Sequence, residues 1–184
     1  VPIIFKDQGL DKIILKHFGL KCTSTDLESW QSEVVKRVLF PSKKVEIAVV
    51  GKYIELQDAY KSIYEAVVHA GIYNDTKVIV RKIDSESIEK DGPSKLLKGV
   101  SGILVPGGFG YRGIEGKIAA IKFARENNIP FLGLCLGMQC AAIEFARNVC
   151  GLKDANSTEF NNKTRYPVIS LIAEQHNIKD MGGT

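Results

Sequence analysis

The sequence has no apolar run long enough to cross a membrane. Its longest apolar stretches, such as Ile47 to Val50 and Ile103 to Val105, fall far short of the roughly 20 residues that a spanning helix needs. A charged side chain follows early, at Lys6, so the N-terminus does not have the layout of a signal peptide. We therefore expect a cytoplasmic protein without a membrane contact. Because the chain begins with Val1, we also expect a piece of a longer protein.

Cysteine is scarce, with four residues in 184, and none of them forms a C-x-x-C pair. They are Cys22, Cys135, Cys140 and Cys150. This argues against a disulfide-stapled scaffold and against a metal site, and it favours reduced thiols.

Runs of like charge are also missing. The 25 basic and 21 acidic side chains are dispersed along the chain and leave a net charge of only +4. This balance is too mild to indicate a nucleic-acid partner. With 45% hydrophobic residues, the chain has the composition of a soluble globular protein with its own core.

The first 43 residues predict a helical arm. Helices are expected at 10–18 and at about 26–39, the second ending before Pro41. Four apolar residues share one face of the second helix: Leu27, Trp30, Val34 and Val38. Either this protein or a neighbouring domain or subunit covers that stripe. We therefore divide the chain into a linker at 1–43 and a second domain at 44–184.

From residue 44 onward, strands and helices alternate. The predicted strands are 45–50, 77–83, 102–105, 130–134 and 168–172. The predicted helices are 58–70, 114–127 and 136–149, with Gly71 as the C-cap of the first. A polar stretch at 153–166 separates the last helix from the last strand. This order predicts an α/β fold with a doubly wound, mostly parallel sheet of the flavodoxin or Rossmann type. Ligands in such sheets bind beyond the carboxyl ends of the strands.

The most informative segment is Gly133-Leu134-Cys135-Leu136-Gly137, at a predicted strand-to-helix junction. It has the form of a nucleophile elbow, in which glycines let the strand and the helix approach closely. The glycine and cysteine content would supply G-x-C-x-G only about 0.03 times by chance. We predict that Cys135 is a nucleophile, with a small buried hydrophobe as the alternative.

A second glycine cluster, Pro106 to Gly113, follows the third predicted strand. Its unobstructed N–H groups could face a developing oxyanion, whereas a loose surface turn is the alternative. The segment lacks the third glycine of a dinucleotide fingerprint. Gly51-Lys52 is not a P-loop, because Glu46 and Tyr53 stand at positions that require Gly and Ser or Thr.

A thiol nucleophile needs a general base, and none of the three histidines is a convincing one. His17 lies in the arm, and His69 is expected in a solvated turn before Gly71. His176 follows the last predicted strand and could approach the cysteine.

These segments together closely resemble the class I, triad-type glutamine amidotransferase domain of CTP synthases, over essentially the whole chain. The resemblance rests on residues 1–10, 51–60, 106–113, 133–139, 155–160 and 182–184. It implies the class I glutamine amidotransferase fold, preceded by the end of a linker from a synthetase domain.

The resemblance also implies roles for individual residues. Cys135 would attack the side-chain carboxamide of glutamine and release ammonia. Gly108 and Leu136 match backbone donors around the oxyanion, with Gly107 beside them. Gln139 and Glu159 match glutamine-binding positions, and Glu159 would suit the amino group of the substrate.

The family further implies partners. A synthetase domain of the same polypeptide would use the ammonia, ATP and magnesium to convert UTP to CTP, and GTP would activate. Phe109 and Arg112 lie in the loop where the family responds to GTP. The resemblance implies no cofactor in this domain, and a homo-oligomer that is a tetramer in the family.

The family's triad histidine and glutamate, and an arginine that holds the substrate carboxylate, come after the position of Thr184. The resemblance therefore implies that these 184 residues are inactive alone. Another hydrolase with the same cysteine elbow and a non-catalytic binding module are the alternatives.

Overall fold

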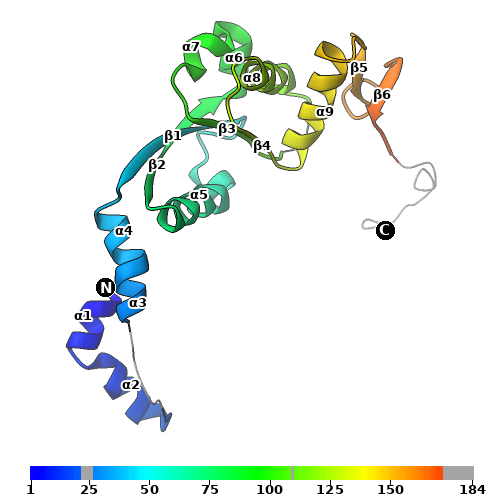
Figure 1. Ribbon diagram of the computed structural model, residues 1–184. Coiled ribbons are helices and arrows are strands. Elements are labelled where there is room, and N and C mark those ends of the chain that lie inside the picture. The colour runs from blue at the N-terminus through cyan, green and yellow to red at the C-terminus, as the bar shows by residue number, and fades with distance from the viewer. Residues whose placement is uncertain (22–26, 109, 172–184) are drawn as a thin grey trace. The chain divides into compact units, whose positions relative to one another are not determined.

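The computed structural model describes residues 1–21, 27–108 and 110–171 (Figure 1). They form two compact units, one of Val1–Lys44 with Ala66–Val78, the other of Val45–Glu65 with Ile79–Thr184. No helix in the described ranges is long and apolar enough to cross a membrane. The predicted domain boundary at residues 43 and 44 stays a prediction.

The first unit is built from short helices. In chain order they are α1 (Pro2–Asp7), α2 (Leu10–Phe18), α3 (Glu28–Trp30), the π-helical turn η1 (Gln31–Val35) and α4 (Lys36–Leu39). Because α3, η1 and α4 are continuous, they form the second predicted helix. The last turns of α5 (Lys61–Tyr73) also belong to this unit.

Arg37 joins the helical arm to α5 within this unit. Its guanidinium donates to the carbonyl oxygen of Tyr73 at 3.0 Å, at the end of α5 where carbonyl groups lack helical partners. Val34 lines a cavity together with Ile72 of α5, whereas Val38 is 54% exposed. The predicted apolar stripe is therefore covered by this protein at Val34 and open at Val38.

The second unit contains a four-stranded sheet of order β2-β1-β3-β4. The strands are β1 (Lys43–Gly51), β2 (Thr76–Asp84), β3 (Gly102–Val105) and β4 (Phe131–Gly133). The pairs β1–β3 and β3–β4 are parallel, with Val49 opposite Leu104 and Val105 opposite Gly133. These pairings confirm the predicted mostly parallel sheet, with its helices, as an α/β fold.

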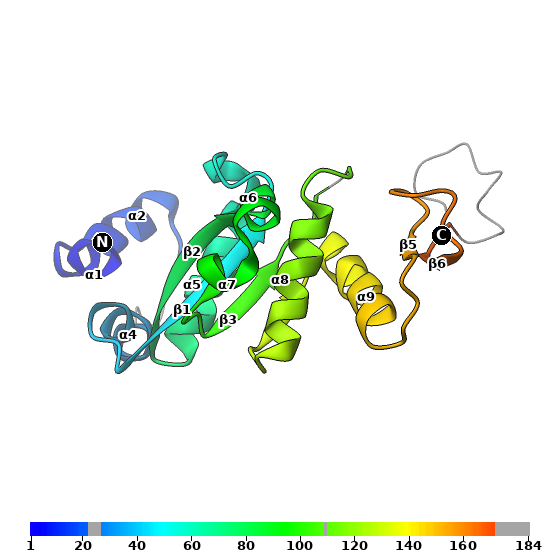
Figure 2. The same cartoon turned by 90° about the horizontal axis from the view of Figure 1, so that it is seen from above.

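Figures 1 and 2 show the helices α6 (Ser85–Asp91), α7 (Pro93–Leu97), α8 (Ile114–Glu126) and α9 (Leu136–Asn148). These helices supply buried side chains to one core with the sheet. In this core Val50 and Val105 of the sheet pack with Ile118 of α8 and Ile143 of α9. Burial of each such side chain stabilises the fold by about 1.5 to 3 kcal/mol. The core thereby positions the loops that follow β3 and β4.

Three element predictions were wrong. The helix α5 continues to Tyr73, so Gly71 is a buried helical residue and not a C-cap. The polar stretch at 153–166 contains a strand, β5 (Ala155–Ser157), which pairs in parallel with β6 (Tyr166–Ile169) in a separate two-stranded sheet. The last strand therefore ends at Ile169, because its partner β5 has only three residues. A 3-10 turn, η2 (Gln57–Tyr60), precedes α5.

Candidate active site

Cys135 lies between β4 and α9 in a backbone conformation that L-residues rarely adopt. Its φ is 52° and its ψ is −108°. A Cβ atom at Gly137 would lie 2.0 Å from the carbonyl oxygen of Val105, and one at Gly133 would lie 2.6 Å from the carbonyl carbon of Gly137. Only glycine fits at these two positions, so the observed turn is the predicted elbow.

The elbow places the thiol at the N-terminus of a 13-residue helix. Cys135 is the N-cap of α9, and its carbonyl oxygen accepts from the N–H of Gln139 at 3.2 Å. Its side chain is exposed. The free N–H groups and the dipole of a helix N-terminus favour a negative charge there. The site therefore presents an accessible sulfur at the N-terminus of a helix.

The other described cysteines differ from Cys135. Cys140 is buried one turn further along α9, and burial raises the pKa of its thiol to about 11, so it is not ionised near neutral pH. Cys150 is exposed beyond the end of α9, without an elbow. Cys22 lies outside the described residues. Of the three described cysteines, Cys135 is the one that combines exposure with a helix N-terminus.

The glycine-rich loop after β3 lies against the elbow. A Cβ atom at Gly107 would be 3.4 Å from Cβ and 3.8 Å from Sγ of Cys135. Gly108 has a φ of +139°, and the N–H groups of Gly107 and Gly108 have no acceptor among the described residues. Leu136 contributes the first helical N–H of α9, and its side chain is buried in the core. These free donors are suited to an oxyanion beside the sulfur.

Gln139 and Glu159 line one cavity of 420 Å³. The other lining residues are Ser157, Thr158, Ile169, Ser170 and Leu171. The side-chain oxygen of Gln139 is buried and has no partner among the described residues. The carboxylate of Glu159 accepts from the N–H of Gly110 at 3.4 Å. The cavity therefore offers an amide and a carboxylate to a polar ligand.

The turn after β5 holds Glu159 in place. The N–H of Glu159 donates to Oγ of Ser157 at 3.2 Å, and Ser157 is 2% exposed. The N–H of Thr158 donates to the carbonyl oxygen of Ile169 in β6 at 2.9 Å. The small β5–β6 sheet, which the sequence analysis missed, is thus the element that orients this carboxylate.

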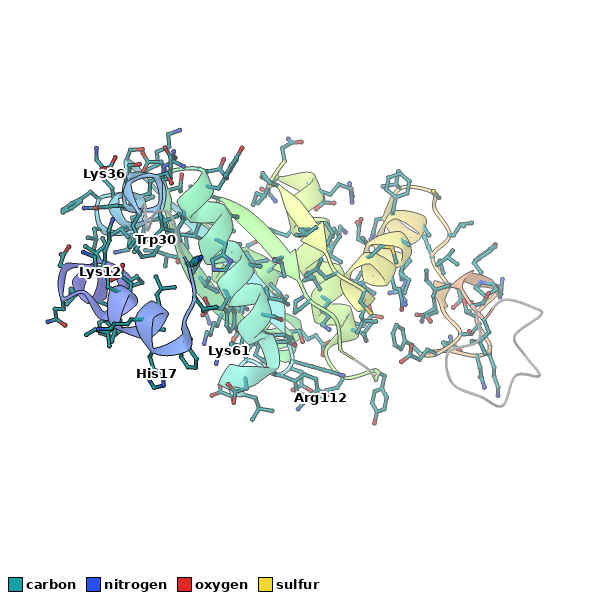
Figure 3. The ribbon with its side chains drawn as sticks, turned by 90° about the horizontal axis from the view of Figure 1, so that it is seen from below. Lys12, His17, Trp30, Lys36, Lys61 and Arg112 are labelled. Carbon is teal, nitrogen blue, oxygen red and sulfur yellow. The ribbon has the colours of Figure 1, made fainter. Side chains whose placement is uncertain are left out.

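Arg112, labelled in Figure 3, contacts two residues outside the glycine-rich loop. Its guanidinium donates to the carbonyl oxygen of Lys52 at 3.1 Å and lies 3.5 Å from the carboxylate of Glu86 on α6. About half of the side chain is exposed. Phe109, the other predicted GTP-response residue, lies outside the described residues.

The two histidines of the described ranges lie on helices. His17 projects from α2 (Figure 3). His69 is an exposed residue within α5 rather than in a turn, which corrects the expectation. Both belong to the first unit, whereas Cys135 belongs to the second. His176 lies outside the described residues. No group of three or more His, Cys, Asp or Glu in the described ranges could hold a metal ion.

Lys117 is a buried polar residue of α8 that the sequence analysis missed. Its side chain is fully buried, and its Nζ has no hydrogen-bond partner among the described residues. A signal was present in the sequence, because Lys117 follows Ile114 by three residues and precedes Ile121 by four. This spacing places the lysine on the inward face of α8.

Comparison with known proteins shows the family. The model of the class-I glutamine amidotransferases matches residues 55–183. CTP synthases from Desulfitobacterium hafniense and Carboxydothermus hydrogenoformans are 57% and 55% identical over all 184 residues. A third, from Ruminiclostridium cellulolyticum, is 56% identical. The chain spans 34% of the length of each of these relatives.

A solved structure gives the same result. The glutaminase domain of the Trypanosoma brucei CTP synthase, with bound acivicin, superposes with a TM-score of 0.68 and is 44% identical. The match covers 72% of this chain and 52% of that one. The chain therefore belongs to the class I glutamine amidotransferase family.

Proposed function

We propose that this chain is the glutaminase part of a longer CTP synthase. The observation that carries the proposal is the contact between the glycine-rich loop and the elbow, since Gly107 lies directly against the Cys135 side chain. A nucleophile and free backbone donors beside it are the two parts that acyl transfer requires.

In the proposed reaction, the sulfur of Cys135 attacks the side-chain carboxamide carbon of glutamine. The N–H groups of Gly108 and Leu136, with Gly107 beside them, stabilise the oxyanion of the tetrahedral intermediate. When the C–N bond breaks, ammonia leaves with a proton from a general acid, and a glutamyl thioester remains. Water then hydrolyses the thioester to glutamate and regenerates the thiol.

The cavity beside the elbow supports glutamine as the substrate. Gln139 lies one helical turn beyond Cys135, and its buried side-chain oxygen can accept from the substrate. Glu159 can bind the substrate's ammonium group in place of the N–H of Gly110. A general hydrolase or a simple binding module would have no use for this amide and carboxylate in one cavity.

The proposal extends to the longer enzyme. The ammonia passes to a synthetase domain that aminates UTP with ATP and magnesium, and GTP activates through the loop that carries Phe109 and Arg112. We further propose a cytoplasmic homo-oligomer, with the triad histidine and glutamate supplied by residues beyond Thr184. The whole-chain identity to CTP synthases supports this extension.

Alkylation tests the proposal. A chloro ketone analogue of glutamine should label Cys135 ahead of Cys140 and Cys150, because only Cys135 combines exposure with the elbow. Peptide mapping by mass spectrometry identifies the labelled thiol, and excess glutamine should protect it. Equal labelling of the other thiols, or labelling that glutamine does not slow, would contradict the proposal.

A further inference from the structure

Arg147, in the last turn of α9, joins three elements of the second unit. Its Nε donates to the carbonyl oxygen of Ala155, the first residue of β5, at 2.7 Å. Its Nη1 donates to the two carboxylate oxygens of Glu115, in the first turn of α8, at 3.0 and 2.9 Å. The Arg147 side chain is 18% exposed, and Ala155 is fully buried. One guanidinium thus links the end of α9 with the starts of α8 and β5.

The strand that Arg147 holds leads directly to the cavity that we assign to glutamine. Ser157 follows Ala155 by two residues in β5 and lines that cavity. The Oγ of Ser157 accepts from the N–H of Glu159 at 3.2 Å. The position of the Glu159 carboxylate therefore depends on the position of β5.

The helix that Arg147 holds follows the glycine-rich loop. That loop ends at Gly113, and Glu115 comes two residues later. Within the loop, the N–H of Gly110 donates to the carboxylate of Glu159 at 3.4 Å. The contacts thus form a closed ring, from the loop through α8, Arg147 and β5 to Glu159 and back to the loop. Arg147 is the point of this ring at which two helices and the small β5–β6 sheet are joined.

The bond to Ala155 is the stronger reason for a role in positioning. The ion pair with Glu115 is open to water, since 63% of the Glu115 side chain is exposed, and such pairs contribute little to stability. The Ala155 carbonyl belongs to a buried residue, where the loss of a charged donor is costly. A two-stranded sheet such as β5–β6 is marginally stable by itself, so it relies on its attachment to the helices.

We propose that Arg147 is a positioning residue that sets the affinity for glutamine by fixing β5, and with it Glu159, relative to the glycine-rich loop. The inference rests on the proposed function, since it requires Glu159 to bind the ammonium group of glutamine. Arg147 itself is not among the described residues that line the cavity, so it acts through β5 and does not touch the substrate.

Steady-state ammonia release from glutamine in the longer enzyme tests the role of Arg147. In Arg147→Met, which keeps a long side chain without the guanidinium, we expect KM for glutamine to rise about five- to fiftyfold, because a charge-assisted hydrogen bond is lost. We expect kcat to stay within about threefold, since the ammonium end of glutamine is remote from the reacting carboxamide and loss of uniform binding raises KM alone.

Arg147→Lys is a second variant should the first fail to fold. It keeps the positive charge without the fork that reaches two partners, so its KM should lie between those of the parent and Arg147→Met.

Alkylation gives a readout that does not require turnover. Iodoacetamide should label Cys135 at the same rate in the parent and in Arg147→Met, because the elbow lies between β4 and α9 and does not include β5. The glutamine concentration that halves this rate should rise in Arg147→Met by the same factor as KM.

Arg81→Met is the matched control. Arg81 of β2 also binds one carboxylate through two nitrogens, at 2.9 and 2.6 Å from Glu46, and also donates to backbone carbonyl groups, those of Leu96 and Lys98, at 3.0 Å. None of these three partners belongs to β5 or lines the glutamine cavity. Arg81→Met should lose stability in urea unfolding and keep the parental KM.

The outcomes separate the two proposals. If glutamine does not slow the alkylation of Cys135 in the parent, the proposed function is wrong. If glutamine protects the parent but the folded Arg147 variants keep the parental KM, only the role of Arg147 is overturned. A fall in kcat at unchanged KM, or an equal rise in KM in Arg81→Met, would also overturn it, because the effect would then come from the elbow or from a general loss of stability.

Discussion

At the scale of the residue, the site depends on backbone geometry more than on side chains. The positive φ of Cys135 is costly for a residue with a Cβ atom, on the order of 1 to 3 kcal/mol. The surrounding core holds the residue in this conformation. Two of the donors beside it, Gly107 and Gly108, belong to glycines, which carry no side chain of their own to obstruct them.

Gly108 provides the sharpest test at this scale. In the longer enzyme, Gly108→Val should lower kcat for glutamine hydrolysis by about 10²- to 10³-fold. Valine does not readily keep the φ of +139°, so its N–H should turn away from the oxyanion, and losing one such donor costs about 2.7 to 4 kcal/mol. The added side chain would meet Lys52 Cε at 3.4 Å and Tyr53 at 3.5 Å, in a backbone region that disfavours valine. Steady-state ammonia release measures the effect.

Gly99→Val is the control for backbone strain. Gly99 also has a positive φ, of +81°, but a Cβ atom there meets nothing within 4 Å. This variant should lose stability and keep its kcat. Unchanged hydrolysis in a folded Gly108→Val protein would remove the loop from the mechanism.

At the scale of the element, α8 and α9 form a pair that carries the site. Arg125 of α8 lies 2.8 Å from the carboxylate of Glu144 on α9, which is 1% exposed. The guanidinium thereby satisfies a buried charge that would otherwise be costly. Lys117 of α8 and Cys140 of α9 are buried as well. The packing of these two helices therefore buries two titratable groups.

Cys140 makes the stability of this pair depend on pH. Its pKa is raised from 9.0 to about 11, so the folded state holds the proton more tightly than the unfolded chain. Its contribution is therefore complete below pH 9 and lost as the pH rises through 11. Relative to Cys140→Ala, the parent should lose about 2 kcal/mol of unfolding free energy between pH 7.5 and 10.5.

Urea unfolding of the two proteins at these pH values measures the difference. Cys140→Ala should be less stable by about 1 kcal/mol at pH 7.5, because it loses packing in the core. At pH 10.5 Cys140→Ala should have the larger free energy of unfolding of the two proteins. A difference that stays constant with pH would show that the thiol does not titrate differently in the folded state.

At the scale of the whole molecule, the proposed role of the chain is to supply ammonia for a reaction that takes place in another domain. It spans 34% of the length of its CTP synthase relatives, and the rest of such an enzyme contains the proposed amination chemistry. Separation of the two half-reactions has a direct consequence for mutation. A substitution in the elbow should stop ammonia release from glutamine and should leave the use of ammonia by the synthetase domain unchanged.

In the longer enzyme, Cys135→Ala should abolish CTP formation from glutamine and leave CTP formation from added ammonium salts within about twofold of the parent. The absorbance of the CTP product measures both rates, one with glutamine and one with an ammonium salt as the nitrogen source. The 184 residues alone should release no measurable ammonia, because a general acid–base group is typically worth 10² to 10⁴ in rate. Loss of both activities in Cys135→Ala would contradict the proposal that glutamine hydrolysis and amination take place in separate domains.

Much of the site could be predicted from the sequence because its parts are local. The elbow motif around Cys135 has five contiguous residues, and the glycine-rich loop has eight. Both motifs can therefore be recognised from the sequence. Alternation of apolar strands and helices likewise indicated the parallel sheet. These features depend on short-range sterics, which sequence determines directly.

Other features were decided only by tertiary contacts. The strand β5 exists because β6 pairs with it, and its three residues have no strong pattern of their own. The orientation of Glu159 follows from that pairing and from the N–H of Gly110, 49 residues away. The burial of Lys117 depends on the packing of α9 over α8, which joins residues far apart in the chain. The sequence thus indicated which groups are candidates for the reaction, whereas long-range packing decided which charges surround them, because an electrostatic environment is a property of the folded interior.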